Sequence, residues 1–308
     1  AYYSPVSYLP QALAIKIARV FSAPVIIQYY AGRLIMVLLW VLAGRFVLRR
    51  TPAYHWLLVV LLLLPMNIYL FNSFSADTVT NLLSLLLFVI VLRCTFDSDH
   101  VSKREQVSIF ILCLLLSQAK LVYVPLVLLV LLIPQTKFSS KALHLLFVFS
   151  AIIVPFAAAY VWSAVAMENY LSFYTYHPDY IEQATLGYAA DYHLQKQYML
   201  AHPLYFPMVL WRSLFTPFQP YLASYIGYLG AYQDVVLHPF FYWLAYGLIF
   251  VIVSGARQLR FSVIQVLIII TAASGSVVLL LLSQHLTWDR VGMGIVELMQ
   301  GRYLTPVM

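Results

Sequence analysis

Long apolar runs without polar interruption recur along this chain and leave few folds open to it. Residues 57–64 and 82–92 form two such runs, and neither alternates apolar with polar side chains. A helix needs about 20 apolar residues to cross the hydrocarbon core of a bilayer. Backbone groups in lipid must be paired inside a helix or a closed barrel, and barrel strands alternate. The pattern therefore predicts an all-α, polytopic transmembrane helix bundle.

The composition favours the same class of protein. Hydrophobic residues make up 63% of the 308 positions and charged residues 9%, whereas about a quarter of an ordinary soluble domain is charged. The basic residues behind the formal charge of +7 lie between apolar runs and not in one patch, so we expect no nucleic-acid partner. Cys94 and Cys113 lie at or within apolar runs, far from any ligand-spaced His or Cys, and are interpreted as free thiols.

Six spans are predicted within one transmembrane domain, at residues 26–43, 54–71, 78–92, 143–165, 240–253 and 263–283. Between the third and fourth, residues 107–133 form two short apolar helices with Lys120 at their joint. These two helices either both cross the membrane or form a re-entrant hairpin. The segment before residue 24 is either a short span or an interfacial helix. Because both chain ends look cut, we expect an N-terminal span and first outer loop before Ala1, and a longer C-terminus.

Basic residues gather in alternate connections, which the positive-inside rule assigns to the cytoplasm. They are Arg45, Arg49, Arg50, Arg93, Lys103, Arg104, Lys137, Lys141, Arg257 and Arg260. The opposite side receives the turn at 72–77, the joint at Lys120, a long loop at 166–239 and the segment 285–300. The long loop is rich in tyrosine, too aromatic for disorder, and is expected to form a folded cap. Its rings either form an interfacial belt or offer sugar-stacking surfaces.

Ionisable residues at membrane depth on the outer side are the candidates for function, because burying a charge there is costly. Asp77 begins a helix, where it either complements the helix dipole with Ser75 as the cap or faces an outer cavity. In the cavity its carboxylate would bind a hydroxyl group or a cation. Lys120 either snorkels to the interface or holds a lipid-linked phosphate as a point charge.

A second group of candidates lies near the C-terminus. Arg302 and Tyr303 either form an interfacial anchor or bind phosphate, which arginine can hold in a bidentate way. Gln300 belongs to the same segment, Gly301 permits close packing, and Glu297 is a candidate ion-pair partner for Arg302.

Other ionisable residues give weaker signals. Arg33 lies inside the first clear span and needs a partner that the sequence does not identify. The histidines are interpreted as ordinary loop residues because they lack ligand spacing; they are His177, His193, His202, His238 and His285. No metal site and no cofactor is evident, and a divalent cation has no support in the pattern.

Several short segments together resemble one family. They are Tyr3-Ser4-Pro5 to Pro10-Gln11, Gly32-Arg33, Leu64-Pro65-Met66, Ser75-Ala76-Asp77-Thr78, Ala119-Lys120-Leu121, Tyr225-Ile226-Gly227-Tyr228 and Gln300-Gly301-Arg302-Tyr303. Their order along the chain resembles the bacterial "domain of unknown function 2142" family of multi-pass membrane proteins, which is similar to the GT-C glycosyltransferases. The resemblance implies a GT-C-like fold in the bacterial plasma (inner) membrane.

The resemblance also implies a reaction. A polyprenyl-phosphate-linked sugar would be the donor, and a cell-surface glycan or lipid would be the acceptor, on the extracytoplasmic face. The family's acidic base would lie upstream of Ala1, so the chain as given is expected to be inactive. Lys120 and Arg302 would stabilise the leaving phosphate, with Asp77 orienting a sugar or the acceptor.

Two other functions remain open. A transporter or flippase for a lipid-linked saccharide would need broken helices and a polar path at the membrane midplane. A non-catalytic scaffold of envelope glycan assembly would lack the acidic pair upstream. The residues that precede Ala1 in the parent protein distinguish the scaffold or transporter from the transferase.

Overall fold

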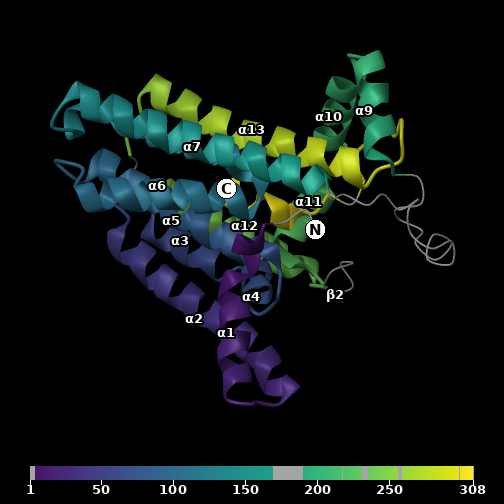
Figure 1. Cartoon of the computed structure of the whole chain (residues 1–308), viewed down its shortest axis with the longest axis horizontal. Helices are drawn as coiled ribbons and strands as arrows, with labels where there is room; N and C mark the ends of the chain where they lie inside the picture. The colour runs from purple at the N-terminus through teal and green to yellow at the C-terminus, as the bar shows by residue number, and fades with distance from the viewer. Residues whose placement is uncertain are drawn as a thin grey trace.

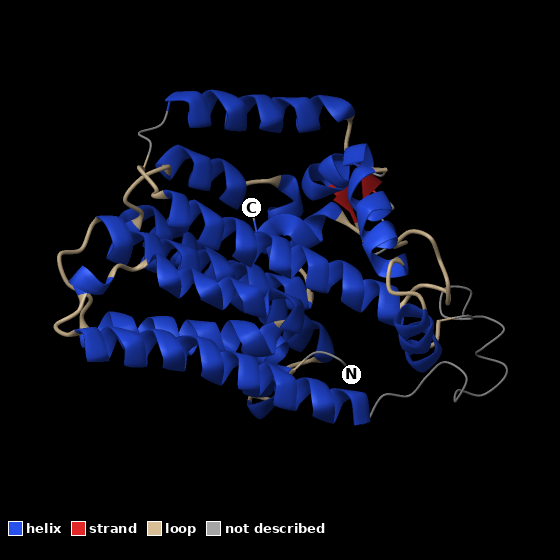
Figure 2. Ribbon diagram, turned by 90° about the horizontal axis from the view of Figure 1, so that it is seen from above, coloured by secondary structure: helices blue, strands red, loops and turns tan. Residues whose placement is uncertain are grey.

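The computed structural model describes residues 4–168, 190–216, 218–230, 235–255, 259–297 and 299–307. Within them, four helices are long and apolar enough to cross a membrane: α2 (Val25–Arg50), α5 (Ala76–Phe96), α7 (Lys141–Glu168) and α13 (Val263–Thr287). The helices α5, α6, α7 and α13 run side by side along the longest axis of the molecule (Figures 1 and 2). Each long helix contains the predicted span and extends beyond it by a few residues.

The outer faces of these helices are apolar and exposed. Val25 on α2, Leu146 on α7, Ile264 on α13 and Phe250 on α12 (Pro239–Gly255) all present most of their side chains to the surroundings. A water-soluble monomer rarely exposes apolar patches on this scale. The solvent that fits these faces is lipid.

The predicted span at 54–71 is not one continuous helix. It is divided into α3 (His55–Leu62) and α4 (Pro65–Phe71). Pro65 explains the break, because proline has no N–H to continue the helical ladder and disfavours helical geometry in the residue before it. The side chain of Asn67 covers part of the break, since its Nδ2 atom donates to the carbonyl oxygen of Leu61 at 2.6 Å.

The double apolar stretch consists of α6 (Lys103–Ala119) followed by η2 (Leu121–Leu132), which is a 3₁₀ helix. An α-helix starting at Leu121 would press the ring of Pro125 against the carbonyl group of Leu121. The 12 residues of η2 rise about 24 Å as a 3₁₀ helix, against about 18 Å as an α-helix. The stretch therefore consists of two consecutive helices, and the choice between a double crossing and a re-entrant hairpin stays a prediction.

The basic connections lie together at one end, here called the basic end (51–54, 97–102, 133–140 and 259–262). Arg93 pairs with Glu105 at 2.9 Å, and Lys137 Nζ donates to the carbonyl oxygen of Ser98 at 2.6 Å. The rings of Phe96 and Phe261 meet edge to face with centroids 5.0 Å apart. Arg257 lies outside the described residues.

Shorter elements occupy the opposite end. They are η1 (Pro5–Tyr8), α1 (Leu9–Val20), α9 (Tyr192–Ala201), α10 (Tyr205–Phe215), α11 (Phe218–Gly227), the strands β1 (Tyr228–Leu229) and β2 (Val235–Val236), and η5 (Gly301–Val307); η3 (Gln135–Lys137) lies at the basic end. The strands pair antiparallel, with Tyr228 opposite Val236. In its described residues, the predicted outer loop therefore contains three helices and two paired strands. Its tyrosines at 170, 174, 176, 180 and 188, and His177, lie outside the described residues.

The core is centred on η2. Tyr123, Val127 and Val130 are almost completely buried, and α5, α6, α7 and α13 all pack against this 3₁₀ helix. Cys94 and Cys113 are free and buried in the same core.

Candidate functional site

Asp77, Lys120 and Arg302, here called the charged cluster, come together from three distant parts of the chain. The Nζ atom of Lys120 lies 2.7 Å from Oδ1 of Asp77, and Nε of Arg302 lies 3.8 Å from Oδ2 of the same carboxylate. Asp77 is 6% exposed and Lys120 is 7% exposed. Three of the candidates named from the sequence thus form one buried group at the end opposite the basic end.

Helix ends bring these side chains to the cluster. Ser75 is the N-cap of α5, and its hydroxyl accepts from the Asp77 N–H at 3.2 Å, so Asp77 lies in the first turn, where the helix dipole favours a carboxylate. Lys120 is the C-cap of α6 and has an extended backbone. The position of Asp77 on the helix dipole is therefore compatible with its place in the charged cluster.

Two tyrosine rings line the cationic side of the cluster. Lys120 Nζ lies 4.3 Å from the ring centroid of Tyr303 and 5.6 Å from that of Tyr123. The guanidinium carbon of Arg302 lies 5.3 Å from the Tyr303 ring. The Tyr123 hydroxyl donates to the carbonyl oxygen of Tyr303 at 2.6 Å. Cation–π contacts of this kind favour a charged ammonium or guanidinium group and tie η5 to η2.

Gly301 lets η5 approach α11 closely. A Cβ atom at this position would lie 2.1 Å from the carbonyl oxygen of Tyr221 and 2.4 Å from the backbone nitrogen of Tyr225. The Gly301 N–H donates to Ser224 Oγ at 2.8 Å. Only glycine fits this backbone-to-backbone contact. Gln300, directly before it, is 9% exposed.

Arg302 holds unused hydrogen-bonding capacity. Its Nε atom is buried, yet no acceptor in the described part of the chain forms a hydrogen bond with it. Buried donors are normally paired. Across the described ranges, no group of three or more His, Cys, Asp or Glu side chains is arranged to hold a metal ion.

Two other candidates lie apart from the charged cluster. Arg33 donates from Nε to the backbone oxygen of Asn72 at 2.7 Å and to its side-chain oxygen at 3.1 Å, so Asn72 is the partner that the sequence did not identify. The ion pair expected between Glu297 and Arg302 is not found: Arg302 faces Asp77, and Glu297 is exposed. A glutamate only a few residues from an arginine suggested that pair, but the guanidinium group of Arg302 is directed to Asp77 instead.

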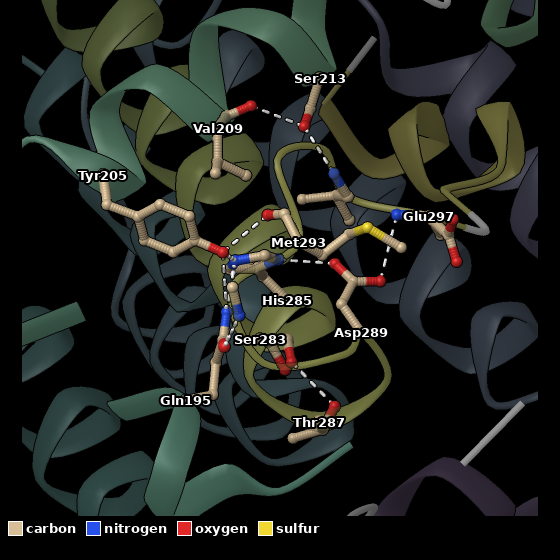
Figure 3. A network of polar contacts seen from close by, with 12 residues as sticks. Gln195, Tyr205, Val209, Ser213, Ser283, His285, Thr287, Asp289, Met293 and Glu297 are labelled. Atoms are coloured by element: carbon tan, nitrogen blue, oxygen red, sulfur yellow. Dashed lines mark hydrogen bonds and ion pairs between the residues drawn. The ribbon is translucent and has the colours of Figure 1, made fainter. Parts of the chain in front are cut away.

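A buried polar network around His285 was missed by sequence analysis. His285 was interpreted as a loop residue, but it lies in α13 and is fully buried. Its Nδ1 atom lies 2.6 Å from Oδ2 of Asp289, and its Nε2 atom contacts Gln195 and Tyr205 (Figure 3). The only available signal was the spacing of four between His285 and Asp289, which in a continuous helix would place both on one face; in the structure Asp289 lies just beyond the end of α13.

The network determines which nitrogen of His285 carries the proton. Gln195 Oε1 accepts from the Gly292 N–H at 3.0 Å, so the amide nitrogen of Gln195 faces the imidazole as a donor. His285 Nε2 is then the acceptor, and Nδ1–H donates to Asp289. Burial raises the pKa of Tyr205 above its ordinary value, so its hydroxyl keeps its proton and donates to the Met293 carbonyl at 2.6 Å.

This network fixes the segment that leads to the charged cluster. Asp289 Oδ1 accepts from the Glu297 N–H at 3.1 Å, and Ser213 Oγ accepts from the Val296 N–H at 2.8 Å. Both bonds hold the irregular stretch between α13 and η5. The network therefore supports the segment that carries Arg302.

A bundle of apolar helices with a buried ionic group at one end defines a multi-pass membrane protein. Comparison with protein families matches residues 1–308 to the predicted membrane proteins designated DUF2142, so the chain belongs to that family. None of the curated proteins and none of the solved structures compared with it matches.

Proposed function

We propose that the protein is a membrane glycosyltransferase of the GT-C type that takes its sugar from a polyprenyl-phosphate-linked donor. The charged cluster would bind the donor phosphate on the extracytoplasmic face of a bacterial inner membrane. The acceptor would be a cell-surface glycan or lipid.

The unsatisfied Nε–H of Arg302 is the observation that carries this proposal. A buried donor on a guanidinium group, next to the ammonium group of Lys120, suits an anionic oxygen. The described side chains of the charged cluster carry two positive charges and one negative charge. An entering phosphate would add the acceptor that the Nε–H of Arg302 lacks, while Asp77 keeps Lys120 in place.

The proposed reaction is a glycosyl transfer. The acceptor hydroxyl oxygen forms a bond to the anomeric carbon of the sugar, and the bond from that carbon to the phosphate oxygen breaks. Polyprenyl phosphate leaves with the electron pair, and its growing negative charge is stabilised by Arg302 and Lys120. The hydroxyl proton passes to a general base, for which the described residues of the cluster provide no uncommitted carboxylate.

The location of the ionic residues favours surface chemistry over transport. Asp77, Lys120 and Arg302 all lie at one end of the bundle, whereas a saccharide transporter needs polar groups near the midplane. Helices α9, α10 and α11 lie at the same end, and α11 contacts η5 directly. These helices would form an aromatic cap that contacts the acceptor.

A transfer assay with the full-length protein and synthetic polyprenyl-phosphate sugars tests the proposal. We expect Arg302→Gln to reduce sugar transfer by at least about 100-fold, the scale of losing one charge-stabilising donor. Arg302→Lys should retain part of the activity, because it keeps the charge but loses the bidentate geometry.

Arg290→Gln is the matched control, since Arg290 is an exposed arginine on the way to η5. It should leave transfer unchanged. If wild-type protein binds polyprenyl phosphate but never transfers sugar, the proposed transferase activity is wrong. If the Arg302→Gln variant transfers sugar at the normal rate, the charged cluster is not the phosphate-binding site.

A further inference from the structure

A partly open cavity of about 410 Å³ extends from the basic end, at Thr51 and Phe261, to Asn81 and Thr305, which lie one helical turn from Asp77 and Arg302. Its walls come from α2, α3, α4, α5, η2, α11, α12, α13, η5 and two connections of the basic end, and include Trp40, Leu57, Phe88, Tyr225 and Ile269. The volume falls within the range of about 300–1,000 Å³ seen for small-molecule sites. No Asp, Glu, Lys, Arg or His belongs to its lining as described. The cavity is therefore shaped for an uncharged, largely apolar molecule.

Three polar side chains in this lining have unsatisfied atoms. Neither Nδ2 nor Oδ1 of Asn81 has a hydrogen-bond partner in the described chain, and the residue is 3% exposed. Asn67 Oδ1 and Thr305 Oγ1 are also buried and unpaired there. Native proteins contain few such groups, and each one calls for an explanation. Three of them in one cavity indicate a ligand with a polar part.

The hydrogen-bonding pattern of these atoms limits the ligand. The Asn67 amide nitrogen is already used on Leu61, so its Oδ1 can only accept. Asn81 offers both a donor and an acceptor, and the Thr305 hydroxyl can act as either. A hydroxyl or amide group of the ligand can donate to Asn67 and accept from Asn81. A carboxylate or phosphate cannot donate to Asn67 and would find no countercharge in the lining.

A pure hydrocarbon chain fits poorly for the opposite reason. An isoprenoid or acyl tail would fill the apolar volume but leave the amide of Asn81 without a partner. The desolvation penalty of those polar atoms would then remain in the complex. A site that binds only hydrocarbon would be better served by leucine than by asparagine at position 81.

We propose that this cavity binds a lipid with an uncharged, hydroxyl-bearing polar group, with the hydroxyl at Asn67, Asn81 and Thr305 and the chain along the apolar wall. Asn81 lies four residues after Asp77 on α5, so its side chain is one turn away on the same face. If the proposed glycosyl transfer holds, the bound lipid is the acceptor and its hydroxyl lies beside the phosphate site. The binding itself depends on the cavity alone.

Photo-crosslinking tests the proposal in the full-length protein, reconstituted in phosphatidylcholine nanodiscs. Three diazirine probes with matched chains are compared: a diacylglycerol, a phosphatidic acid and an alkane. We expect the diacylglycerol to label peptides of the cavity wall, such as α3, at least about tenfold more than either other probe. Asn81→Leu and Thr305→Val should each reduce this labelling, the former by about tenfold.

Thr80→Val is the matched control. Thr80 is buried next to Asn81 on α5, but its hydroxyl donates to the Ala76 carbonyl and it does not line the cavity. Equal labelling by all three probes, or unchanged labelling in Asn81→Leu, would overturn the proposal. The cavity would then be filled by hydrocarbon or water and not by a hydroxyl-bearing lipid. No sugar donor is present, so a failed transferase assay and a failed lipid site are distinguishable.

Discussion

Lys120 and Asp77 form a buried ion pair across the bundle, with 2.7 Å between Nζ and Oδ1, although 43 residues separate them in the chain. One residue ends α6 and the other begins α5, so the pair joins the ends of two antiparallel neighbours. A buried pair of this kind is sensitive to the loss of either partner, because the remaining charge stays without its countercharge.

Asp77→Asn should therefore destabilise the protein by about 3–5 kcal/mol, since Lys120 keeps its charge inside the fold. The free energy of unfolding in detergent, measured by denaturant titration, provides the readout. The double variant Asp77→Leu/Lys120→Met removes both charges and should recover most of that loss. If the double variant is as unstable as Asp77→Asn alone, the pair does not dominate the energetics of this region.

Gly301→Ala should displace η5 from α11. Its Cβ would meet the backbone of Tyr221 at 2.1 Å, and backbone cannot move aside as a side chain can. We expect a loss of at least about 1–3 kcal/mol in the free energy of unfolding, together with weaker phosphate binding because Arg302 moves with η5.

Gly247→Ala is the control for that substitution. Gly247 lies inside α12, and nothing lies within 4 Å of the position that the alanine methyl group would occupy. This change should be neutral or stabilising by about 0.5–1 kcal/mol, as expected for alanine in a helix interior. Equal effects of the two substitutions would contradict the close contact at Gly301.

Asp289→Ala should loosen the segment between α13 and η5. The variant removes the acceptor of the Glu297 N–H and the partner of His285 Nδ1. Hydrogen exchange at Glu297 and Gly292 should accelerate, by an amount that corresponds to about 1–3 kcal/mol in local opening free energy. Exchange in α2, far from the network, should remain as in the wild type; uniform acceleration would instead indicate global unfolding.

Cysteine labelling in intact cells should separate the two ends of the bundle. Arg49→Cys and Lys103→Cys lie at exposed positions near the basic end, whereas Arg290→Cys is exposed near the opposite end. A membrane-impermeant maleimide added outside should label only Arg290→Cys, because the basic connections are predicted to be cytoplasmic. The native Cys94 and Cys113 are buried and should not react. If the reagent added outside labels Arg49→Cys, the predicted orientation of the protein in the membrane is wrong and the basic end faces outward.

Part of this fold follows from pattern alone. The long helices were predictable because lipid requires apolar runs of a minimum length. Counting the predicted membrane crossings placed Asp77, Lys120 and Arg302 on the same side of the membrane. The structure adds that Asp77 contacts both cationic side chains. Their role in binding phosphate stays a prediction.

Other features depend on packing that no local pattern reveals. Pro65 was visible, but whether a proline kinks a span or divides it depends on the neighbours that satisfy the freed carbonyls, here Asn67. His285 lacked ligand spacing along the chain, and its partners Gln195 and Tyr205 come from about 80–90 residues away. The unpaired amide of Asn81 is a property of the cavity around it and not of its segment.

The 3₁₀ helix η2 has a consequence for how its residues tolerate change. Because η2 packs against four other helices, most of its apolar side chains contact protein and not lipid; the exceptions are Leu131, which is exposed, and Leu126 and Leu129, which line the cavity. Three-residue periodicity also means that one inserted residue would turn everything after it by about 120°. The centre of this membrane protein should therefore tolerate fewer substitutions than its lipid-facing surface, where one apolar side chain can replace another with little loss of stability.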